Sequence, residues 1–218
     1  MLVTLREALQ KAFNNNYAVA GLVTLGWEDM RAYVEAAEKE NCPIILQAGP
    51  SCRQHTPLPV LGKMFNYLAE NTKVPVVAHL DHGYTKEECI MAIDSGFSSI
   101  MFDGSKKTLH ENIDATATIC ELAHSAGVSC EGEIGFVGYS GGEGSAGTVP
   151  EEASKFALDT NIDAMAISVG NVHLQENKEG GLDEDRIRAI EKLTDVPLVI
   201  HGGSGVPVAQ RTFLSQNS

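Results

Sequence analysis

The sequence predicts an α/β fold of repeated strand–helix units, and three observations support this prediction. Seven apolar runs alternate with segments of helical periodicity. The runs are nearly continuous in apolar residues, as in parallel strands that are covered on both faces. Their starts recur about every 30 residues, the length of one βα unit. Seven such units favour a (β/α)₈ TIM barrel over an open doubly wound sheet.

The expected elements follow one another in chain order. Residues 4–14 have the spacing of an amphipathic helix, and the apolar runs predict strands at 17–24, 43–48, 74–80, 98–102, 128–133, 162–169 and 196–201. Helices are expected at 27–39, 58–70, 85–95, 107–126, 151–158 and 183–193, with a last helix starting near Val206. We expect one domain over residues 1–218. A barrel of only seven units would leave two strand edges open, so we expect an eighth unit, which is missing from the chain as given.

Composition excludes several classes of protein. The net charge is −13 and the chain contains no cluster of Lys and Arg, so nucleic acid is not an expected partner. No apolar run reaches the roughly 18 residues of a membrane span, and the N-terminus lacks the features of a signal peptide. We therefore expect a cytoplasmic protein. The five cysteines are odd in number and widely spaced, which is typical of reduced, mostly buried thiols.

Polar residues follow the predicted strands at the point where each strand ends, which is where barrel enzymes carry their chemistry. Three of these strand ends carry a histidine: His82, His173 and His201. Carboxylates stand beside the first of them or at other strand ends: Asp81, Asp103 and Glu133. The carboxyl ends of parallel strands meet at one face, so we expect these side chains to share a site.

Three imidazoles that leave coordination positions open are typical of a catalytic zinc site. Zinc suits nitrogen ligands and brings no redox chemistry. The alternative for each histidine is a hydrogen bond that caps a strand end. His79 stands three residues before His82 and, by strand alternation, on the opposite side, so we interpret it as a buried structural residue.

Two glycine-rich segments are further candidates. Gly202, Gly203 and Ser204 follow His201 and open the last helix, where backbone N–H groups can bind an anion. The loop over residues 135–149 has the length of a lid or binding loop and carries Glu143. That carboxylate is either a base that swings in when substrate binds or a solvated surface group.

The motifs HLDHG (residues 79–83) and HGGSG (201–205), together with YAV (17–19), SSIMFDGS (98–105) and EGEIG (131–135), resemble the class II, zinc-dependent ketose-bisphosphate aldolases. This group contains the fructose-1,6-bisphosphate and tagatose-1,6-bisphosphate aldolases. The resemblance covers nearly the whole chain. It implies a lyase of carbohydrate metabolism, such as glycolysis, with a phosphorylated ketose as substrate and a homodimeric or homotetrameric barrel.

The resemblance also implies roles for single residues. It makes His82, His173 and His201 the zinc ligands, and Asp81 the acid/base at the C4 hydroxyl. Asp103 and Glu133 match positions that hold a second or alternative divalent metal in some relatives. Glu143 lies close to the lid glutamate that takes a proton from the ketone-derived carbon. The phosphate site corresponds to Gly202, Gly203 and Ser204.

Three segments depart from the family pattern. Val23 and Leu25 stand where polar residues are expected, and Gln47-Ala48-Gly49 replaces Gln-x-Ser, with Ser51 two residues later. Leu174 follows His173 where the family has a glycine near the phosphate and a monovalent cation. We therefore predict a different phosphorylated ketose, or one with a single phosphate. The predicted substrate contacts are Ser51, Gly170, Gly202, Gly203 and Ser204.

Two other functions remain open at this point. An enediolate on zinc would also serve a metal-dependent sugar-phosphate epimerase or isomerase. The missing eighth unit and the replaced phosphate serine would also fit a catalytically impaired barrel that binds a ligand or a partner.

Overall fold

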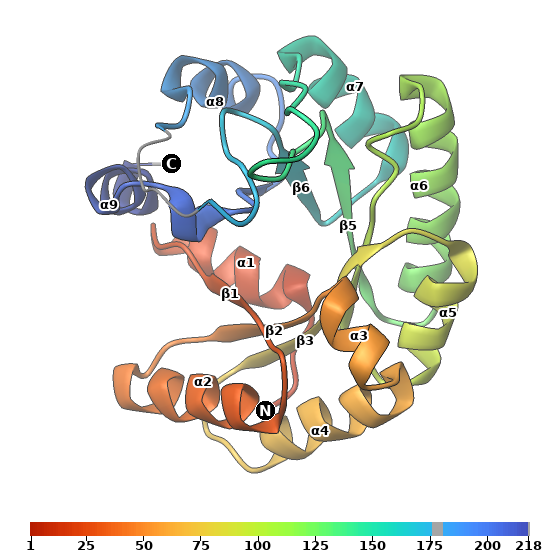
Figure 1. Ribbon diagram of the computed structural model, residues 1–218, viewed down its shortest axis with the longest axis vertical. Coiled ribbons are helices and arrows are strands. Elements are labelled where there is room, and N and C mark those ends of the chain that lie inside the picture. Colours follow the sequence, from red (N-terminus) through yellow and green to blue (C-terminus); the bar gives the residue numbers. More distant parts are fainter. Residues whose placement is uncertain (176–180, 218) are drawn as a thin grey trace. The chain divides into compact units, whose positions relative to one another are not determined.

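The computed structural model describes residues 1–175 and 181–217 (Figure 1). The segment between the predicted strand at 162–169 and the predicted helix at 183–193 lies partly outside these residues. The chain divides into two compact units, which are described separately: unit 1 holds residues 1–103 and 118–131, and unit 2 holds residues 104–117 and 132–218. The single domain over 1–218 stays a prediction.

The described residues form seven strands that follow one another in chain order within the sheet. The strands are β1 (Ala20–Val23), β2 (Ile44–Ala48), β3 (Val76–Gly83), β4 (Ser99–Phe102), β5 (Ser129–Ile134), β6 (Ala164–Ile167) and β7 (Leu198–Val199). The helices are α1 (Leu5–Asn14), α2 (Trp27–Glu40), α3 (Pro50–His55), α4 (Leu58–Glu70), α5 (Lys86–Asp94), α6 (Leu109–Ser125), α7 (Pro150–Thr160), α8 (Glu184–Glu191) and α9 (Val208–Asn217), with a 3₁₀ turn at Gly203–Gly205. The predicted α/β fold of alternating strands and helices is confirmed.

Unit 1 is built on the parallel strands β1 to β4. Every residue of β3 is buried, as expected for a central strand with both faces covered. Helices α2, α4 and α5 pack against these strands, and Figure 1 shows α2 and α4 running along them. The Phe65 ring of α4 meets Phe97 edge to face, with ring centroids 5.6 Å apart. This apolar layer fixes the strand on which Asp81 and His82 lie.

The N-terminal helix begins as its sequence dictates. The Thr4 hydroxyl accepts the N–H of Glu7, and the Glu7 carboxylate accepts the N–H of Thr4, so the two residues form a capping box. Just before the helix, the backbone of Val3 donates to Val76 at the start of β3. The helix also contacts β3. Together these contacts anchor the N-terminal end of the strand that ends at the candidate site.

One local expectation was wrong, and one helix was missed. All four residues of β1 are exposed, although the apolar run predicted a strand buried on both faces. Among the described strands β1 pairs with β2 alone, which accounts for an edge position. Helix α3 was not predicted, because six residues are too few to show a hydrophobic period. Pro50 at its first turn and Gly49 before it are its only sequence signals.

Unit 2 holds β6, which is buried throughout, and the short strand β7 in parallel register with it. Helices α7 and α8 contact each other. The loop over 135–149 is not without structure, since Phe136 and Ala146 exchange two backbone hydrogen bonds of 2.8 and 2.9 Å. The two ends of the predicted lid are therefore paired at its base, and Glu143 lies in the part between them.

Two predictions from composition can be compared with the structure. All five cysteines are free; four are buried and Cys42 is exposed. Burial raises the pKa of the Cys89 thiol to about 12, which keeps it protonated and unreactive. Among the described residues, no helix combines the length and the hydropathy needed to cross a bilayer.

Candidate active site

The carboxyl end of β3 carries Asp81 and His82, and both side chains are buried. The register of β3 against β4 shifts between Leu80 and Gly83, so strict side-chain alternation ends before Asp81. His82 has a φ of 53°, in the left-handed region that residues other than glycine rarely adopt. The irregularity leaves Asp81 Oδ1 3.9 Å from His82 Nε2. Both functional groups therefore lie together, which alternation alone does not predict.

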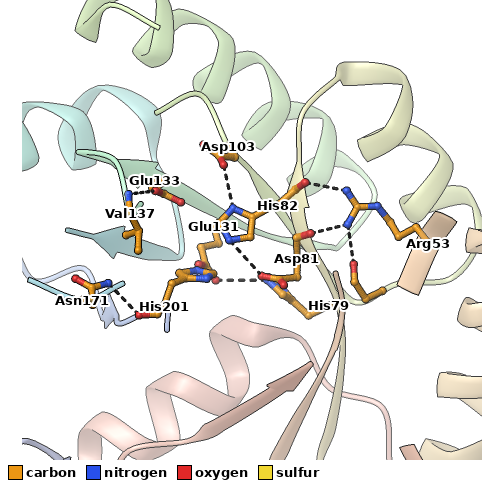
Figure 2. Close-up of polar contacts among 11 residues, drawn as sticks. Arg53, His79, Asp81, His82, Asp103, Glu131, Glu133, Val137, Asn171 and His201 are labelled. Carbon is orange, nitrogen blue, oxygen red and sulfur yellow. Dashed lines mark hydrogen bonds and ion pairs between the residues drawn. The ribbon is translucent and has the colours of Figure 1, made fainter. Parts of the chain in front are cut away.

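Asp103, just after β4, fixes the ring of His82. Its Oδ2 lies 2.9 Å from His82 Nδ1, and Figure 2 shows the contact. A carboxylate only accepts hydrogen bonds, so Nδ1 carries the proton and Nε2 is the nitrogen with a lone pair. This carboxylate–imidazole pair is the arrangement that orients a metal-binding histidine in zinc proteins.

Arg53 of α3, which is not among the residues predicted from the sequence, holds the backbone of the same turn. Its Nη1 donates to the carbonyls of Ala48 and Asp81 at 2.9 and 2.6 Å, and its Nη2 donates to the carbonyl of His82 at 2.8 Å (Figure 2). Its Nε donates to Glu88 of α5 at 2.7 Å. The proline-started helix after β2 was the one signal in the sequence that could have placed Arg53 at this strand end.

His79 is a buried residue with polar partners, as predicted. Its Nδ1 lies 2.8 Å from the Ser99 hydroxyl. Its Nε2 lies 3.5 Å from a carboxylate oxygen of Glu131, as Figure 2 shows. These contacts connect β3, β4 and β5 within unit 1. They give His79 a structural explanation.

In unit 2, His173 and His201 lie close to each other, with ring centroids 5.7 Å apart and planes at 64°. His201 is buried, and its carbonyl accepts a 3.0 Å hydrogen bond from the side chain of Asn171 (Figure 2). Asn171 also donates to the carbonyl of Ile167. His173 is half-buried and stacks on Tyr139 of the lid loop, at 4.8 Å between centroids. Asn171 and Tyr139 are thus additional residues that support the two histidines.

The lid loop is joined to His173 through its backbone. The N–H of His173 donates to Gly138, and the N–H of Ser140 donates to His173. At the loop tip, Glu143 is 65% exposed and forms a 2.8 Å ion pair with Lys106. The Lys106 ammonium also lies 4.8 Å from the centre of the Phe136 ring. In this conformation the Glu143 carboxylate is engaged at the surface.

Glu133, at the end of β5, is buried. Its Oε1 accepts the N–H of Val137 at 3.3 Å (Figure 2). Its carbonyl accepts the side-chain amide of Asn112 at 2.8 Å. This carboxylate is therefore held in place at the start of the lid loop.

The glycine-rich turn after β7 requires at least one of its glycines. Gly202 has a φ of 67°, and a β-carbon there would clash with the carbonyl of Val172. The N–H groups of Gly205 and Val206 are used within the 3₁₀ turn, where they bond Gly202 and Gly203. Helix α9 then begins at Val208, two residues after the start that was predicted near Val206.

The other predicted substrate residues are at the surface of their units. Ser51, in the first turn of α3, is exposed, and so are Gly170 and Ser204. Gly170 has a φ of 98°, which a side chain would strain. Leu174 has a φ of 54° and is 78% exposed. It keeps the left-handed backbone expected of a glycine but carries a large apolar side chain.

By residue type and burial, both units carry side chains that could bind a metal ion. Unit 1 has His82 and Asp103, and unit 2 has Glu133, His173 and His201. A chain with parallel strands in sequence order and such groups at the strand ends has the features of a metal-dependent barrel enzyme.

Comparisons with known proteins define the family. The sequence profile of the family "Fructose-bisphosphate aldolase class-II" matches residues 3–216. The 6-phospho-5-dehydro-2-deoxy-D-gluconate aldolase of Bacillus velezensis is 38% identical over 95% of this chain and 74% of its own length. The fructose-bisphosphate aldolase of Geobacillus stearothermophilus is 37% identical over 96% of this chain and 75% of its own length.

The comparison of folds agrees. The crystal structure of the YdjI aldolase from Escherichia coli K12 matches 99% of this chain and 79% of that chain, with a TM-score of 0.88 and 29% identity. The chain belongs to the class II fructose-bisphosphate aldolase family, a family of metal-dependent aldehyde-lyases.

Proposed function

We propose that the protein is a zinc-dependent aldolase that cleaves a phosphorylated ketose. The observation that carries the proposal is the pairing of His82 with Asp103, at the end of a strand whose HLDHG motif has the aldolase pattern. Such a carboxylate–imidazole pair prepares one nitrogen to bind a metal. Family membership adds that the relatives which match almost the whole chain are aldolases.

The residues fit a zinc ion by their chemistry. We propose that His82, His173 and His201 hold it. Three imidazoles suit zinc, and a three-ligand site leaves a position open for substrate. When bound, the metal supplies Lewis-acid stabilisation of the negative charge that grows on the ketose oxygens during cleavage. Asp103 and Glu133, with His82, are proposed as a second or alternative divalent site.

Asp81 is proposed to move the proton of the cleavage step. Its carboxylate would take the proton of the C4 hydroxyl as the C3–C4 bond breaks and return it in the reverse reaction. This carboxylate is buried, and its Oδ1 lies 3.9 Å from Nε2 of His82. Asp81→Asn keeps the shape but cannot accept the proton, so it should abolish cleavage while leaving zinc affinity largely unchanged.

Glu143 is proposed to exchange a proton with the ketone-derived carbon after cleavage. Its engagement with Lys106 at the surface means that it must leave that ion pair to act. An exposed pair of this kind is worth about 0–1 kcal/mol, so the release costs little. The joined backbones of the lid loop and His173 give the loop a fixed base about which its tip can move.

The substrate is proposed to be a ketose with one phosphate. The relatives include an aldolase named for a 6-phospho sugar acid and an aldolase named for a bisphosphate. Leu174 favours the first kind of substrate, because it places a large apolar side chain where the family pattern has a glycine near a phosphate. A monovalent cation at that place is not proposed for the same reason.

The test compares cleavage of fructose and tagatose bisphosphates with cleavage of single-phosphate ketoses, and identifies the products. Two fragments from a single-phosphate ketose, at a kcat/KM well above that for either bisphosphate, are expected. Full activity on a bisphosphate would refute the single-phosphate proposal. A single isomeric product would refute aldol cleavage.

In the same preparation, light scattering tests the proposed homodimer or homotetramer. The cytoplasmic location stays a prediction.

A further inference from the structure

We propose that Arg53 is a positioning residue that sets Asp81 and His82 in the geometry needed for metal binding and proton transfer. This inference rests on the proposed function. The hydrogen bonds of Arg53 are not to the side chains of Asp81 and His82. Arg53 binds the backbone carbonyls of both residues, at 2.6 and 2.8 Å. Arg53 therefore fixes the backbone from which the side chains of Asp81 and His82 project.

The backbone at this point needs an external support. Asp81 and His82 fall within the register shift of β3 against β4, between Leu80 and Gly83. The left-handed φ of His82 costs of order 1–3 kcal/mol and persists only where its surroundings impose it. The Arg53 guanidinium bonds the carbonyl of Asp81, just before the backbone of His82, and the carbonyl of His82 itself. We infer that these hydrogen bonds impose the conformation.

The N–H donors of the Arg53 guanidinium are used in hydrogen bonds to this part of the chain. The Arg53 side chain is only 7% exposed, and four of its N–H donations are to defined acceptors: the carbonyls of Ala48, Asp81 and His82 and the carboxylate of Glu88. Burying a cation is costly unless it is paired and hydrogen-bonded. A lysine has one compact ammonium and cannot reproduce a planar fork that reaches several acceptors at once.

Glu88 extends the support to the residues after the strand. Its Oε1 accepts from Arg53, and its Oε2 accepts the N–H of Tyr84 at 3.0 Å. Glu88 is itself fixed in the first turn of α5, where its N–H donates to Thr85. Arg53 and Glu88 together thus hold the backbone from Asp81 to Tyr84.

The experiment measures zinc affinity of the metal-free full chain by competition with a chromophoric chelator, and the visible spectrum after loading with Co²⁺. The variants are Arg53→Met and Arg53→Lys, with thermal unfolding recorded for each. The control is Arg31→Met, which removes an exposed arginine from an ion pair with Glu35 on α2. Changes in groups that orient a metal ligand typically weaken affinity by about 10- to 100-fold, and we expect this for Arg53→Met.

We expect Arg53→Lys to unfold near the wild-type temperature, to bind zinc about tenfold more weakly, in line with the effect of disturbing the groups around a ligand, and to give an altered Co²⁺ spectrum. Arg31→Met should match wild type. Wild-type affinity and spectrum in Arg53→Lys would overturn the positioning role and leave the proposed aldolase function standing. If the wild type itself binds no zinc, the proposed function fails and this inference fails with it. If Arg53→Met does not fold, Arg53→Lys alone decides.

Discussion

Asp103 accepts the Nδ1 proton of His82 at 2.9 Å, and this contact leaves Nε2 as the nitrogen that can bind a metal. The pair connects the ends of two neighbouring strands, β3 and β4. A second pair, His110 with Asp114 on α6, has the same 2.9 Å separation but lies exposed to solvent. The His110–Asp114 pair can therefore serve as a control: it has the same type of contact but lies outside the candidate site.

Asp103→Asn is expected to weaken zinc binding by about 10- to 100-fold, because an amide no longer fixes the imidazole through a charged acceptor. Asp114→Asn is the matched control and should bind zinc like the wild type. Chelator competition measures both. Equal affinity in the two variants would show that Asp103 does not prepare His82 for a metal.

Glu143→Gln is expected to lower kcat by about 10²- to 10⁴-fold, the usual contribution of a general acid or base. Zinc affinity should not change, because Glu143 is not a proposed ligand. Glu121→Gln, an exposed glutamate on α6, is the control. Steady-state kinetics on the cleaved substrate measures kcat. An unchanged kcat in Glu143→Gln would assign the carboxylate to the solvated surface, together with its partner Lys106.

Gly202→Ala is expected to destabilise the protein by about 1–3 kcal/mol, because its φ of 67° disfavours a side chain and the new β-carbon meets the carbonyl of Val172. Gly203→Ala is the adjacent control, since a β-carbon there meets nothing within 4 Å. Denaturant unfolding of both variants gives the comparison. If they unfold alike, the turn after His201 does not depend on the glycine conformation.

The Cys89 thiol makes stability depend on high pH. Its pKa of about 12 in the folded chain exceeds the ordinary value of 9.0, because burial penalises the thiolate. The folded state thus holds the proton more tightly, so this contribution to stability is complete below pH 9 and is lost as the pH rises toward 12. Cys89→Ala should flatten the fall in unfolding temperature between pH 9 and 11 relative to wild type. Parallel curves would contradict this account.

The sequence predicted the parts of the site that depend on strand order. Buried parallel strands appear as continuous apolar runs, so the polar residues that follow them, such as Asp81 and Asp103, could be placed at strand ends. The contact between Asp81 and His82 could not be predicted, because it depends on a register shift that reverses the simple alternation. Arg53 was missed because it lies on a six-residue helix with no periodicity. The exposed strand β1 was missed because an apolar run does not reveal which strand lies at an edge.

The central claim is that His82, His173 and His201 hold a catalytic zinc ion, and metal analysis tests it most directly. Purified wild type, His201→Ala and the control His110→Ala, which removes an exposed histidine, are dialysed together and their zinc content is measured by atomic emission. We predict about one zinc per chain in wild type and control, as for a three-histidine site, and far less in His201→Ala. A wild type without zinc, or a His201→Ala variant that binds it equally well, would contradict the account.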